Sequence, residues 1–512
     1  MQDSPSFWDT ALPQAASSAV DAGDPHSALA LYEDAINKGA FDPITLGNYG
    51  VLLWRLYEFR KGEEAFARVV EDPRANSGTL RRVAHCYFEV GRFAKAVAVM
   101  RVAVARSPQP DASTTNSLAW VLERDHQIDE ARQVAEAAHA IDPSYGPAVR
   151  LLAHLDQRAG DLEGAVRRIT EQFRQHPSDS DWGLRYELAA VCDRLGHYDE
   201  AWTALCQAKS QLAEKSAEQL QYSYHIRQRQ WELTQSVTPA DLRRWRQEGN
   251  ALTPQRRIAF LTGFPRSGTT LLEQIIATNA DTVGTDESGI LPHHFVSPLV
   301  WRAADAMDAI LELRSFDAEQ LTAGRESFYQ MTESYLDQPV GERLLVEKTP
   351  LQTADMPLSL RMFPEARWLI ALRDPRDVVL SYLFTLIPLN WTSAAAADVV
   401  EACRFYADTM RHWLWWRSRL DWPTCETAYE RLIAEPQEES RRVAEFLGLS
   451  WDPSMVDERH RSERKAVRTP TYVDVIKPLY KRSIGRWHNY QRYLEPGLEI
   501  LRPFVKAFGY EE

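Results

Sequence analysis

The residues with the clearest chemical potential lie at positions 257–270, in the sequence RIAFLTGFPRSGTT. The apolar run 258–261 is too short for a helix and predicts a strand. Gly263 and Pro265 break this run, and apolar residues at helical spacing follow at positions 270–276. A strand, a glycine-bearing turn and a helix direct backbone N–H groups and the positive end of a helix dipole at a phosphate group.

This turn differs from the P-loop of nucleoside triphosphatases in one residue that matters. Four residues separate Gly263 from Gly268, as in a P-loop, but Thr269 occupies the place of the P-loop lysine. The positive charge lies inside the turn instead, at Arg266. We expect the amides of residues 267–270, the hydroxyls of Thr269 and Thr270, and the Arg266 guanidinium to bind a phosphate. The alternative is an ordinary turn between a strand and a helix.

The motif PRSGTT after a strand resembles the 5′-phosphosulfate-binding loop of sulfotransferases, which use 3′-phosphoadenosine 5′-phosphosulfate (PAPS). The resemblance is closest to the tyrosylprotein sulfotransferase branch and covers roughly residues 256–505. It implies PAPS as sulfuryl donor, adenosine 3′,5′-bisphosphate as product, and no metal. It also implies that Arg266, Ser267, Gly268, Thr269 and Thr270 bind the donor.

A second stretch of the same family follows at residues 369–381, LIALRDPRDVVLS. An apolar strand ends at Arg373, and Ser381 stands eight residues later on a new helix. In sulfotransferases an arginine and a serine at these positions hold the 3′-phosphate. A guanidinium supplies a directional charged fork and a serine supplies a neutral donor. RDPRD alone could instead form a surface ion-pair cluster.

The general base of the tyrosylprotein branch is a glutamate, and Glu287 stands at its distance, 21 residues after the loop arginine. The reaction needs a carboxylate there because a phenol with a pKa near 10 must lose its proton. Asp286 competes for this role, and either residue could simply cap the following helix. His293 and His294 are out of register with the histidine base of small-molecule sulfotransferases.

Four further positions correspond to family positions; two of them match the family residue and two carry a substitution. Lys348, in LLVEKTP, matches a strand-end lysine that is implied to stabilise charge on the bridging oxygen of the leaving group. Tyr429, in AYERL, matches a tyrosine near the nucleotide, although a core tyrosine is the alternative. Thr471 and Arg486 replace the family's serine and lysine around VIKP, keeping the hydroxyl and the charge. Arg266 is expected to act in catalysis with Lys348 by stabilising charge on the 5′-phosphate side, Thr471 to assist there, and Arg486 to bind the nucleotide.

The N-terminal half carries two phased markers. Alanines recur at positions 28, 65, 96, 131, 165 and 201, and prolines at positions 43, 73, 108, 143 and 177. A period of roughly 34 residues with a small residue at the helix crossing is the tetratricopeptide pattern. We expect five to six helix pairs in residues 15–210, after a tail at residues 1–14. Such an array could bind a peptide or protein, or could serve only as a scaffold or homodimerisation module.

A composition change separates the halves. Residues 211–255 predict a helical cap and a polar, proline-bearing linker. From residue 256 to 512, short β-rich runs alternate with helical stretches, which predicts an α/β domain with a mostly parallel sheet. The fold class is therefore α plus α/β: a tetratricopeptide superhelix followed by a P-loop-like sulfotransferase domain. Ligands of such sheets bind beyond the carboxyl ends of the strands.

Composition excludes several other classes. The chain has 512 residues, a net charge of −13 and five scattered cysteines. An acidic balance argues against general nucleic-acid binding. The sequence shows no transmembrane-length apolar run, no signal-peptide pattern and no metal-ligand spacing. We therefore expect a cytoplasmic protein, unlike the membrane-anchored, secretory animal enzymes that it resembles.

Three functional hypotheses remain open. The first is transfer of a sulfuryl group to a tyrosine of a peptide or protein, which the repeats deliver. The second is sulfation of a small molecule, lipid or glycan, with the repeats serving as scaffold or dimerisation module. The third is an adaptor whose second domain is an inactive nucleotide binder. The presence of all five main family positions, Arg266, Glu287, Lys348, Arg373 and Ser381, argues against the third.

Overall fold

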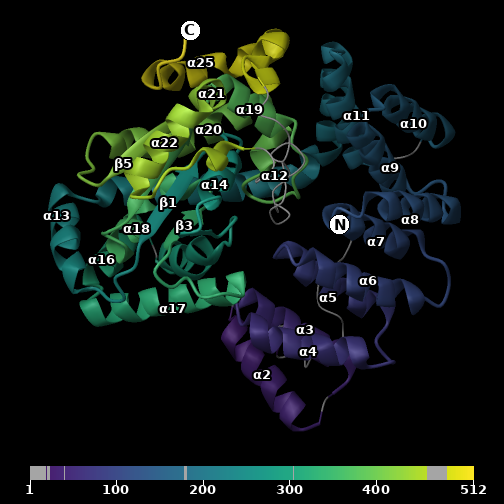
Figure 1. Cartoon of the computed structure of the whole chain (residues 1–512), viewed down its shortest axis with the longest axis horizontal. Helices are drawn as coiled ribbons and strands as arrows, with labels where there is room; N and C mark the ends of the chain where they lie inside the picture. Colours follow the sequence, from purple (N-terminus) through teal and green to yellow (C-terminus); the bar gives the residue numbers. More distant parts are fainter. Residues whose placement is uncertain are drawn as a thin grey trace. The chain divides into compact units, whose positions relative to one another are not determined.

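The computed structural model describes residues 16, 19, 24–39, 41–177, 181–303, 305–457 and 481–511. The chain divides into two compact units, residues 1–208 and residues 209–512 (Figure 1). The boundary falls inside a single long helix, α12 (Tyr198–Ser236). Each unit is described below by itself.

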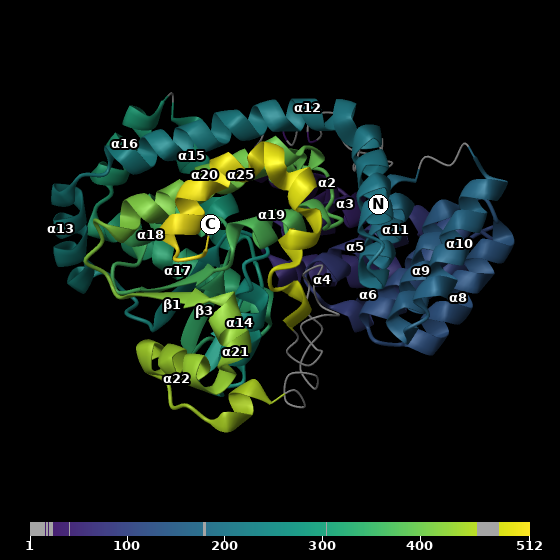
Figure 2. The same cartoon turned by 90° about the horizontal axis from the view of Figure 1, so that it is seen from above.

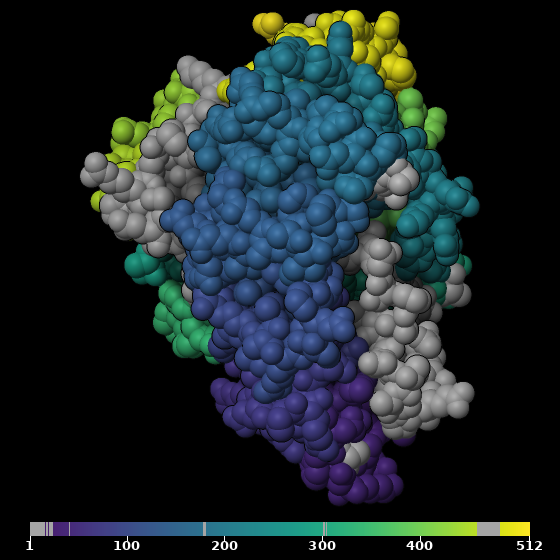
Figure 3. Space-filling model, turned by 90° about the vertical axis from the view of Figure 1, so that its right-hand side faces the viewer, coloured from purple at the N-terminus to yellow at the C-terminus, as the bar shows by residue number. Residues whose placement is uncertain are grey.

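The first unit is a stack of helix pairs. Its helices are α2 (Pro25–Asn37), α3 (Pro43–Arg55), α4 (Phe59–Glu71), α5 (Ser77–Glu89), α6 (Phe93–Ala105), α7 (Ala112–Arg124), α8 (Ile128–Ile141), α9 (Gly146–Ala159), α10 (Leu162–Gln175), α11 (Trp182–Leu195) and the start of α12. Within a pair such as α3 and α4 the two helices pack together, and the first helices of successive pairs also contact one another. In Figure 3 these pairs follow one another in sequence order along the stack.

The markers read from the sequence occupy the positions expected of tetratricopeptide repeats. All six recurring alanines are buried. Gly160 and Gly196 cap helices with left-handed φ angles of 90° and 79°, and a second helix of a pair starts two residues after each. Side chains such as those of Asp42 and Asp111 cap first helices by accepting hydrogen bonds from backbone N–H groups. The predicted helical array is confirmed.

The second unit is built on a five-stranded sheet. Its strands are β1 (Ile258–Gly263), β2 (Thr282–Gly284), β3 (Leu344–Lys348), β4 (Arg367–Leu372) and β5 (Thr424–Ala428). They lie in the order β2-β3-β1-β4-β5, and every neighbouring pair is parallel. The predicted parallel sheet is confirmed. Because β1 lies between β3 and β4, the turn that follows β1 is flanked by the ends of both.

Helices cover both faces of this sheet. They are α13 (Pro239–Glu248), α14 (Thr269–Ala277), α15 (Ser297–Arg302), α16 (Ala306–Ser315), α17 (Ala318–Leu336), α18 (Met356–Met362), α19 (Pro375–Leu383), α20 (Val399–Arg417), α21 (Tyr429–Ala434), α22 (Pro436–Leu447) and α25 (Gln491–Ala507). Short helical turns lie at Gly249–Ala251, Leu291–Val296, Gln352–Ala354, Ala394–Ala397, Pro453–Val456, Lys481–Ser483 and Arg486–Tyr490. None of the helices in the described part of the chain combines the length and apolar character that a membrane span requires.

Successive side chains of β1 point to opposite faces of the sheet and pack into the core on each side. Ala259 and Leu261 point to a cluster that includes residues of α14 and α22. Phe260 points to the other face, where its ring stacks on Trp368 with centroids 4.6 Å apart. All six residues of β1 are buried, as expected for the central strand of a parallel sheet covered on both faces. The strand thus fixes the position of its following turn.

The second part of α12 belongs to this unit. Figure 2 shows the helix running along the helical side of the sheet domain, over α20. Arg227 Nη1 donates to Asp408 at 2.7 Å, and the Thr234 hydroxyl lies 2.8 Å from His412 Nδ1. Both partners lie in or beside the core of the sheet domain. This part of α12 is therefore packed as part of the α/β unit.

Gly263 is the residue whose replacement should disturb the exit from β1 most. Its φ is 150°, and a Cβ there would lie 2.4 Å from the carbonyl oxygen of Ala371 in β4. We expect Gly263→Ala to lower the free energy of unfolding by about 2–4 kcal/mol, because backbone strain of about 1–3 kcal/mol adds to this contact. Urea denaturation of the whole protein measures the loss.

Gly341→Ala is the matched control. Gly341 also has a positive φ, 60°, but nothing lies within 4 Å of the added Cβ. Only the cost of a left-handed residue, about 1–2 kcal/mol, applies there. Equal losses in the two variants would contradict the close approach of β1 to β4.

Candidate functional site

The turn at residues 264–268 joins β1 to α14 in a geometry suited to an anion. Arg266 and Gly268 adopt left-handed φ angles of 75° and 92°. Ser267, Thr269 and Thr270 are buried. The first N–H groups of α14 have no partner within the helix and carry its positive dipole end. The observed α14 agrees with the predicted helix, and its first turn offers the amides expected to cradle a phosphate.

Gly268 is a site of close approach by Tyr429. A Cβ on Gly268 would lie 2.7 Å from Cδ2 of the Tyr429 ring, so a larger residue would displace that ring or the turn. Tyr429 is the first residue of α21, directly after β5. Its hydroxyl lies 2.8 Å from the Ser483 hydroxyl. Tyr429 therefore lies against the turn at residues 264–268, and its proximity to a nucleotide stays a prediction.

Arg266, Arg373 and Ser381 meet on the β4 side of this turn. Arg266 Nε donates to Ser381 Oγ at 3.1 Å. Arg373 Nη1 donates to the carbonyl oxygen of Arg266 at 3.1 Å, and the Arg373 guanidinium lies 4.9 Å from the Tyr429 ring centroid. Arg373 and Ser381 are 6% and 7% exposed. The structure thus brings Arg266, which is expected to bind the 5′-phosphosulfate, into direct contact with Arg373 and Ser381, which are expected to bind the 3′-phosphate.

The segment at residues 481–490 is bonded to the same cluster. Arg373 Nη2 donates to the Ser483 carbonyl oxygen at 2.6 Å. The Asp377 carboxylate, at the start of α19, accepts from the amides of Gly485 and Trp487 at 2.6 and 2.8 Å. Burial raises the pKa of Asp377. Arg486 lies with its guanidinium 4.6 Å from the Phe384 ring centroid. Thr471 lies outside the described residues.

Acidic side chains gather on the β3 side of the turn, around one ammonium. Lys348 Nζ lies 2.9 Å from Glu287 Oε1, 3.1 Å from Asp286 Oδ1 and 3.3 Å from Glu273 Oε2. The Lys348 side chain is fully buried and that of Glu273 is 3% exposed, whereas the Asp286 and Glu287 side chains are 23% and 40% exposed. Glu287 is therefore the carboxylate of this group that solvent reaches most easily.

Backbone hydrogen bonds hold Asp286 and Glu287 in place beside β3. The amide of Thr285 donates to the carbonyl of Val346, and the amide of Glu287 donates to the carbonyl of Lys348, at 3.2 and 3.1 Å. Asp286 and Glu287 have positive φ angles of 45° and 63°. Such conformations cost free energy in residues other than glycine and cluster at functional sites. The carboxylates are held in a strained loop next to the lysine.

Electrostatics follow from this crowding. Burial disfavours the charge on Lys348, but attraction to Glu273, Glu287 and Asp286 outweighs it and holds the pKa of Lys348 well above its usual value. Burial also raises the pKa of Glu273 to about 7, against the opposing attraction of Lys348. Lys348 therefore stays charged across the physiological range, and Glu273 keeps its proton to a higher pH than an exposed glutamate does.

Sequence reasoning missed Glu273, Asp377 and Ser483. Glu273 could have been noticed as a lone acid within the apolar run LLEQII, where a charge needs a buried partner. Asp377 belongs to the RDPRD stretch that could have been a surface cluster, but it is 1% exposed. Arg376 and Asp374 form a buried pair in the same stretch. Ser483 carried no signal beyond its position between VIKP and Arg486.

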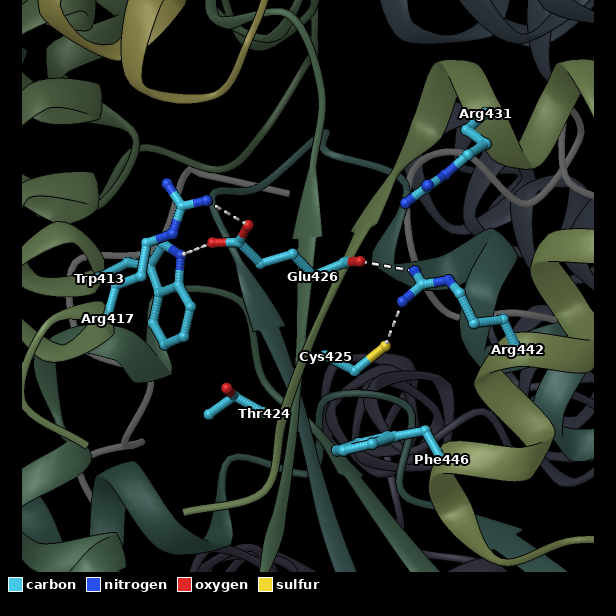
Figure 4. Close-up of a pocket in the computed structure, with 8 residues that line it drawn as sticks. All are labelled: Trp413, Arg417, Thr424, Cys425, Glu426, Arg431, Arg442 and Phe446. Carbon is cyan, nitrogen blue, oxygen red and sulfur yellow. Dashed lines mark hydrogen bonds and ion pairs between the residues drawn. The ribbon is translucent and has the colours of Figure 1, made fainter. Parts of the chain in front are cut away.

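A separate cavity of about 540 Å³ lies along the outer side of the edge strand β5 (Figure 4). Trp413 and Arg417 of α20 line one side, and Arg442 and Phe446 of α22 line the other. Its arginines are already paired: Arg417 with Glu426, and Arg431 and Arg442 with Glu439. In the described ranges, no three His, Cys, Asp or Glu side chains are grouped so that they could hold a metal ion. The candidate functional site therefore remains the region at the carboxyl ends of β1, β3 and β4.

Comparisons with known proteins agree with both halves of this structure. Residues 259–453 match the family model described as "Sulfotransferase family", and residues 122–184 match the model described as "Tetratricopeptide repeat". The chain therefore carries a sulfotransferase-family domain in its C-terminal half and tetratricopeptide repeats in its N-terminal half.

Individual relatives are distant. An uncharacterized protein of Aquifex aeolicus is 26% identical over 401 residues, which cover 76% of this chain and half of the Aquifex protein. Protein-tyrosine sulfotransferase 1 of Danio rerio is 20% identical over 267 residues, covering 50% of this chain and 72% of that protein. Among solved structures, MamA from Desulfovibrio magneticus RS-1 has a TM-score of 0.29 at 19% identity, covering 32% of this chain and 93% of that one.

Removing the Lys348 ammonium should leave the repulsion among the carboxylates of Glu273, Asp286 and Glu287 uncompensated. We expect Lys348→Ala to lower the free energy of unfolding by about 3–5 kcal/mol at pH 8, as for a buried ion pair that loses one partner. Without the ammonium, the already raised pKa of Glu273 rises further above its value in the unfolded chain. The folded variant then binds a proton more readily, so acidification to pH 5.5 should restore part of the stability.

Lys209→Ala supplies the control for this pH effect. Lys209 is also buried, but its Nζ donates to the carbonyl oxygens of Leu383 and Ala396. Thermal unfolding at both pH values should show a loss for Lys209→Ala that acid does not reverse. A loss in Lys348→Ala that is the same at both pH values would contradict the charge arrangement.

Proposed function

We propose that the α/β unit transfers a sulfuryl group from PAPS to an acceptor hydroxyl, and that the acceptor is a tyrosine of a peptide or protein. The observation that carries the proposal is the convergence at the central strand. The phosphate-binding turn after β1 has an arginine-rich cluster at the end of β4 on one side. On its other side, at the end of β3, lies a lysine with accessible carboxylates.

The β4 side fits the two phosphate groups of the donor. The amides of residues 267–270 and the Thr269 and Thr270 hydroxyls bind the 5′-phosphosulfate, and Arg373 with Ser381 binds the 3′-phosphate. Arg266 bonds to Ser381 in the present structure, so its guanidinium links the two phosphate sites. Tyr429 and Arg486 border the nucleotide. No metal enters this scheme, since the turn lacks the lysine arrangement of a P-loop.

The β3 side fits the removal of the acceptor's proton. Glu287 accepts the proton of the hydroxyl as the oxygen–sulfur bond forms and the bond from sulfur to the bridging oxygen breaks. Lys348 stabilises the negative charge that develops on that bridging oxygen, and Thr471 assists on the same side. Positioning and charge stabilisation supply most of the rate in such displacements.

The acceptor class rests on two supports. Glu287 occupies the register of the tyrosylprotein branch, and similarity to the named protein-tyrosine sulfotransferases extends over about half of this chain. That similarity is 20–23%, so a small-molecule, lipid or glycan hydroxyl is the alternative, with the repeats as scaffold or dimerisation module. In the proposed reaction the repeats hold the protein acceptor.

We also propose a cytoplasmic location, which the five free cysteines support.

The donor assignment predicts a ranking of nucleotides. Adenosine 3′,5′-bisphosphate should bind far more tightly than AMP or ADP, because only it offers a 3′-phosphate to Arg373 and Ser381. Arg373→Ala should weaken its binding by about 1.5–3 kcal/mol, the size of a charged hydrogen bond, and Ser381→Ala by about 0.5–1.5 kcal/mol. Isothermal calorimetry measures all of these. Equal affinities for the three nucleotides would rule out the 3′-phosphate assignment.

The base assignment predicts a difference between neighbouring carboxylates. Glu287→Gln keeps the size of the side chain but cannot accept a proton, so kcat should fall by about 10²–10⁴-fold with nucleotide affinity nearly unchanged. Asp286→Asn, the matched control, should reduce kcat much less. If the aspartate variant is instead the inactive one, the base is Asp286. If both variants keep normal turnover, another group deprotonates the acceptor.

A further inference from the structure

Glu273 connects the three parts of the site through a single buried side chain. It lies on α14, the helix whose first turn forms the proposed phosphate-binding site. Its Oε1 accepts a hydrogen bond from the amide of Asp286 at 2.9 Å, and its Oε2 lies 3.3 Å from Lys348 Nζ. Gly284 leaves room for it, because a Cβ there would lie 2.7 Å from Oε1. One carboxylate thus contacts the phosphate helix, the base loop and the lysine.

The carboxylates around Lys348 carry more negative charge than its single ammonium can neutralise. One ammonium faces three carboxylates, those of Glu273, Asp286 and Glu287, all within 3.3 Å. Glu273 is 2% exposed and has no access to solvent or to an acceptor, whereas the Glu287 side chain is 40% exposed. The Lys348 ammonium donates hydrogen bonds to Glu287 and Asp286 at 2.9 and 3.1 Å, and Glu273 Oε2 faces it at 3.3 Å as a third, buried counter-ion. A buried carboxylate would still compensate the charge of Lys348 if Glu287 turned toward an acceptor.

We propose that Glu273 is a positioning residue: its buried carboxylate anchors the Lys348 ammonium and the Asp286 amide, and thereby leaves Glu287 available to the acceptor hydroxyl. This rests on the proposed function. Lys348 stays charged and fixed on Glu273 while Glu287 turns to the acceptor and takes its proton. No covalent step involves Glu273.

Protonation of Glu273 should weaken this anchor. The groups that face it are Lys348 from β3, and Asp286 and Glu287 from the loop after β2. Burial raises the pKa of Glu273, so this carboxyl gains its proton at a higher pH than an exposed glutamate does. Protonation removes the charge that faces Lys348, so kcat should fall as the pH is lowered, and this fall should depend on residue 273.

The test compares Glu273→Gln with Asp355→Asn in the full-length protein. The glutamine can still accept the hydrogen bond from Asp286 but carries no charge for Lys348. Asp355 is the matched control, since it is also a buried carboxyl with a pKa raised by burial to about 7, and its partner is Gln230. We expect a 10–100-fold lower kcat in Glu273→Gln, with KM for PAPS and affinity for adenosine 3′,5′-bisphosphate nearly unchanged.

A direct titration separates the role of Glu273 from the reaction itself. In protein labelled with ¹³C at the glutamate side-chain carboxyl carbon, a resonance that titrates above the range of exposed glutamates should vanish in Glu273→Gln and persist in Asp355→Asn. Glu273→Asp, which keeps the charge, should retain more activity than Glu273→Gln and serves if the glutamine variant fails to fold.

A titration that persists in Glu273→Gln, or equal kcat values and pH profiles in that variant and the wild type, would overturn the role of Glu273. A wild-type protein that transfers sulfate to no acceptor but keeps the glutamate titration would overturn the proposed function instead.

Discussion

The central position of β1 in a five-stranded parallel sheet is the constraint on which the candidate site depends. Parallel strands end at the same edge, so the turn after β1 must lie between the ends of β3 and β4. That placement gives the turn neighbours from segments about 80 to 110 residues away in sequence, Lys348 and Arg373 among them. Burial on both faces prevents the strand from shifting its register, and the helix dipole of α14 is thereby aimed at a fixed point.

The two sides of the turn have opposite electrostatic character. On the β4 side, Arg373 donates to the carbonyl oxygen of Arg266 and lies over the ring of Tyr429, and Arg266 donates to Ser381. This basic arrangement suits the doubly charged nucleotide of the proposed reaction. On the β3 side, carboxylates outnumber the single ammonium of Lys348. In the proposed reaction, a donor anion and a proton acceptor would repel each other if they shared one subsite. The arrangement across β1 keeps the two apart.

Much of this arrangement could be predicted from the sequence because local patterns carry it. The apolar runs before the turn, before Lys348 and before Arg373 predicted β1, β3 and β4, and the motifs placed Arg373 and Ser381 at the end of β4 and on the helix that follows it. The three-residue strand β2 was not predicted, since Thr282–Gly284 is too short for a recognisable alternation. The strand order was also beyond reach, because β3 pairs with β1 and separates it from β2.

The same limit explains why Glu273 escaped notice. Its contacts with Lys348 and with the amide of Asp286 depend on β3 lying beside β1, which no local pattern records. The left-handed conformations of Asp286 and Glu287 were likewise not readable, since neither is the glycine that such angles favour. Long-range pairing, rather than propensity, decides this part of the site.

The measurement that tests the central claim most directly is transfer of label from [³⁵S]PAPS by the full-length protein. It is offered separately to a protein extract and to a metabolite extract, with a chelator present. The account predicts that label appears on protein as tyrosine sulfate. Label on a small molecule alone would move the acceptor to the alternative class. No transfer to either extract, from a protein that is folded, would contradict the account.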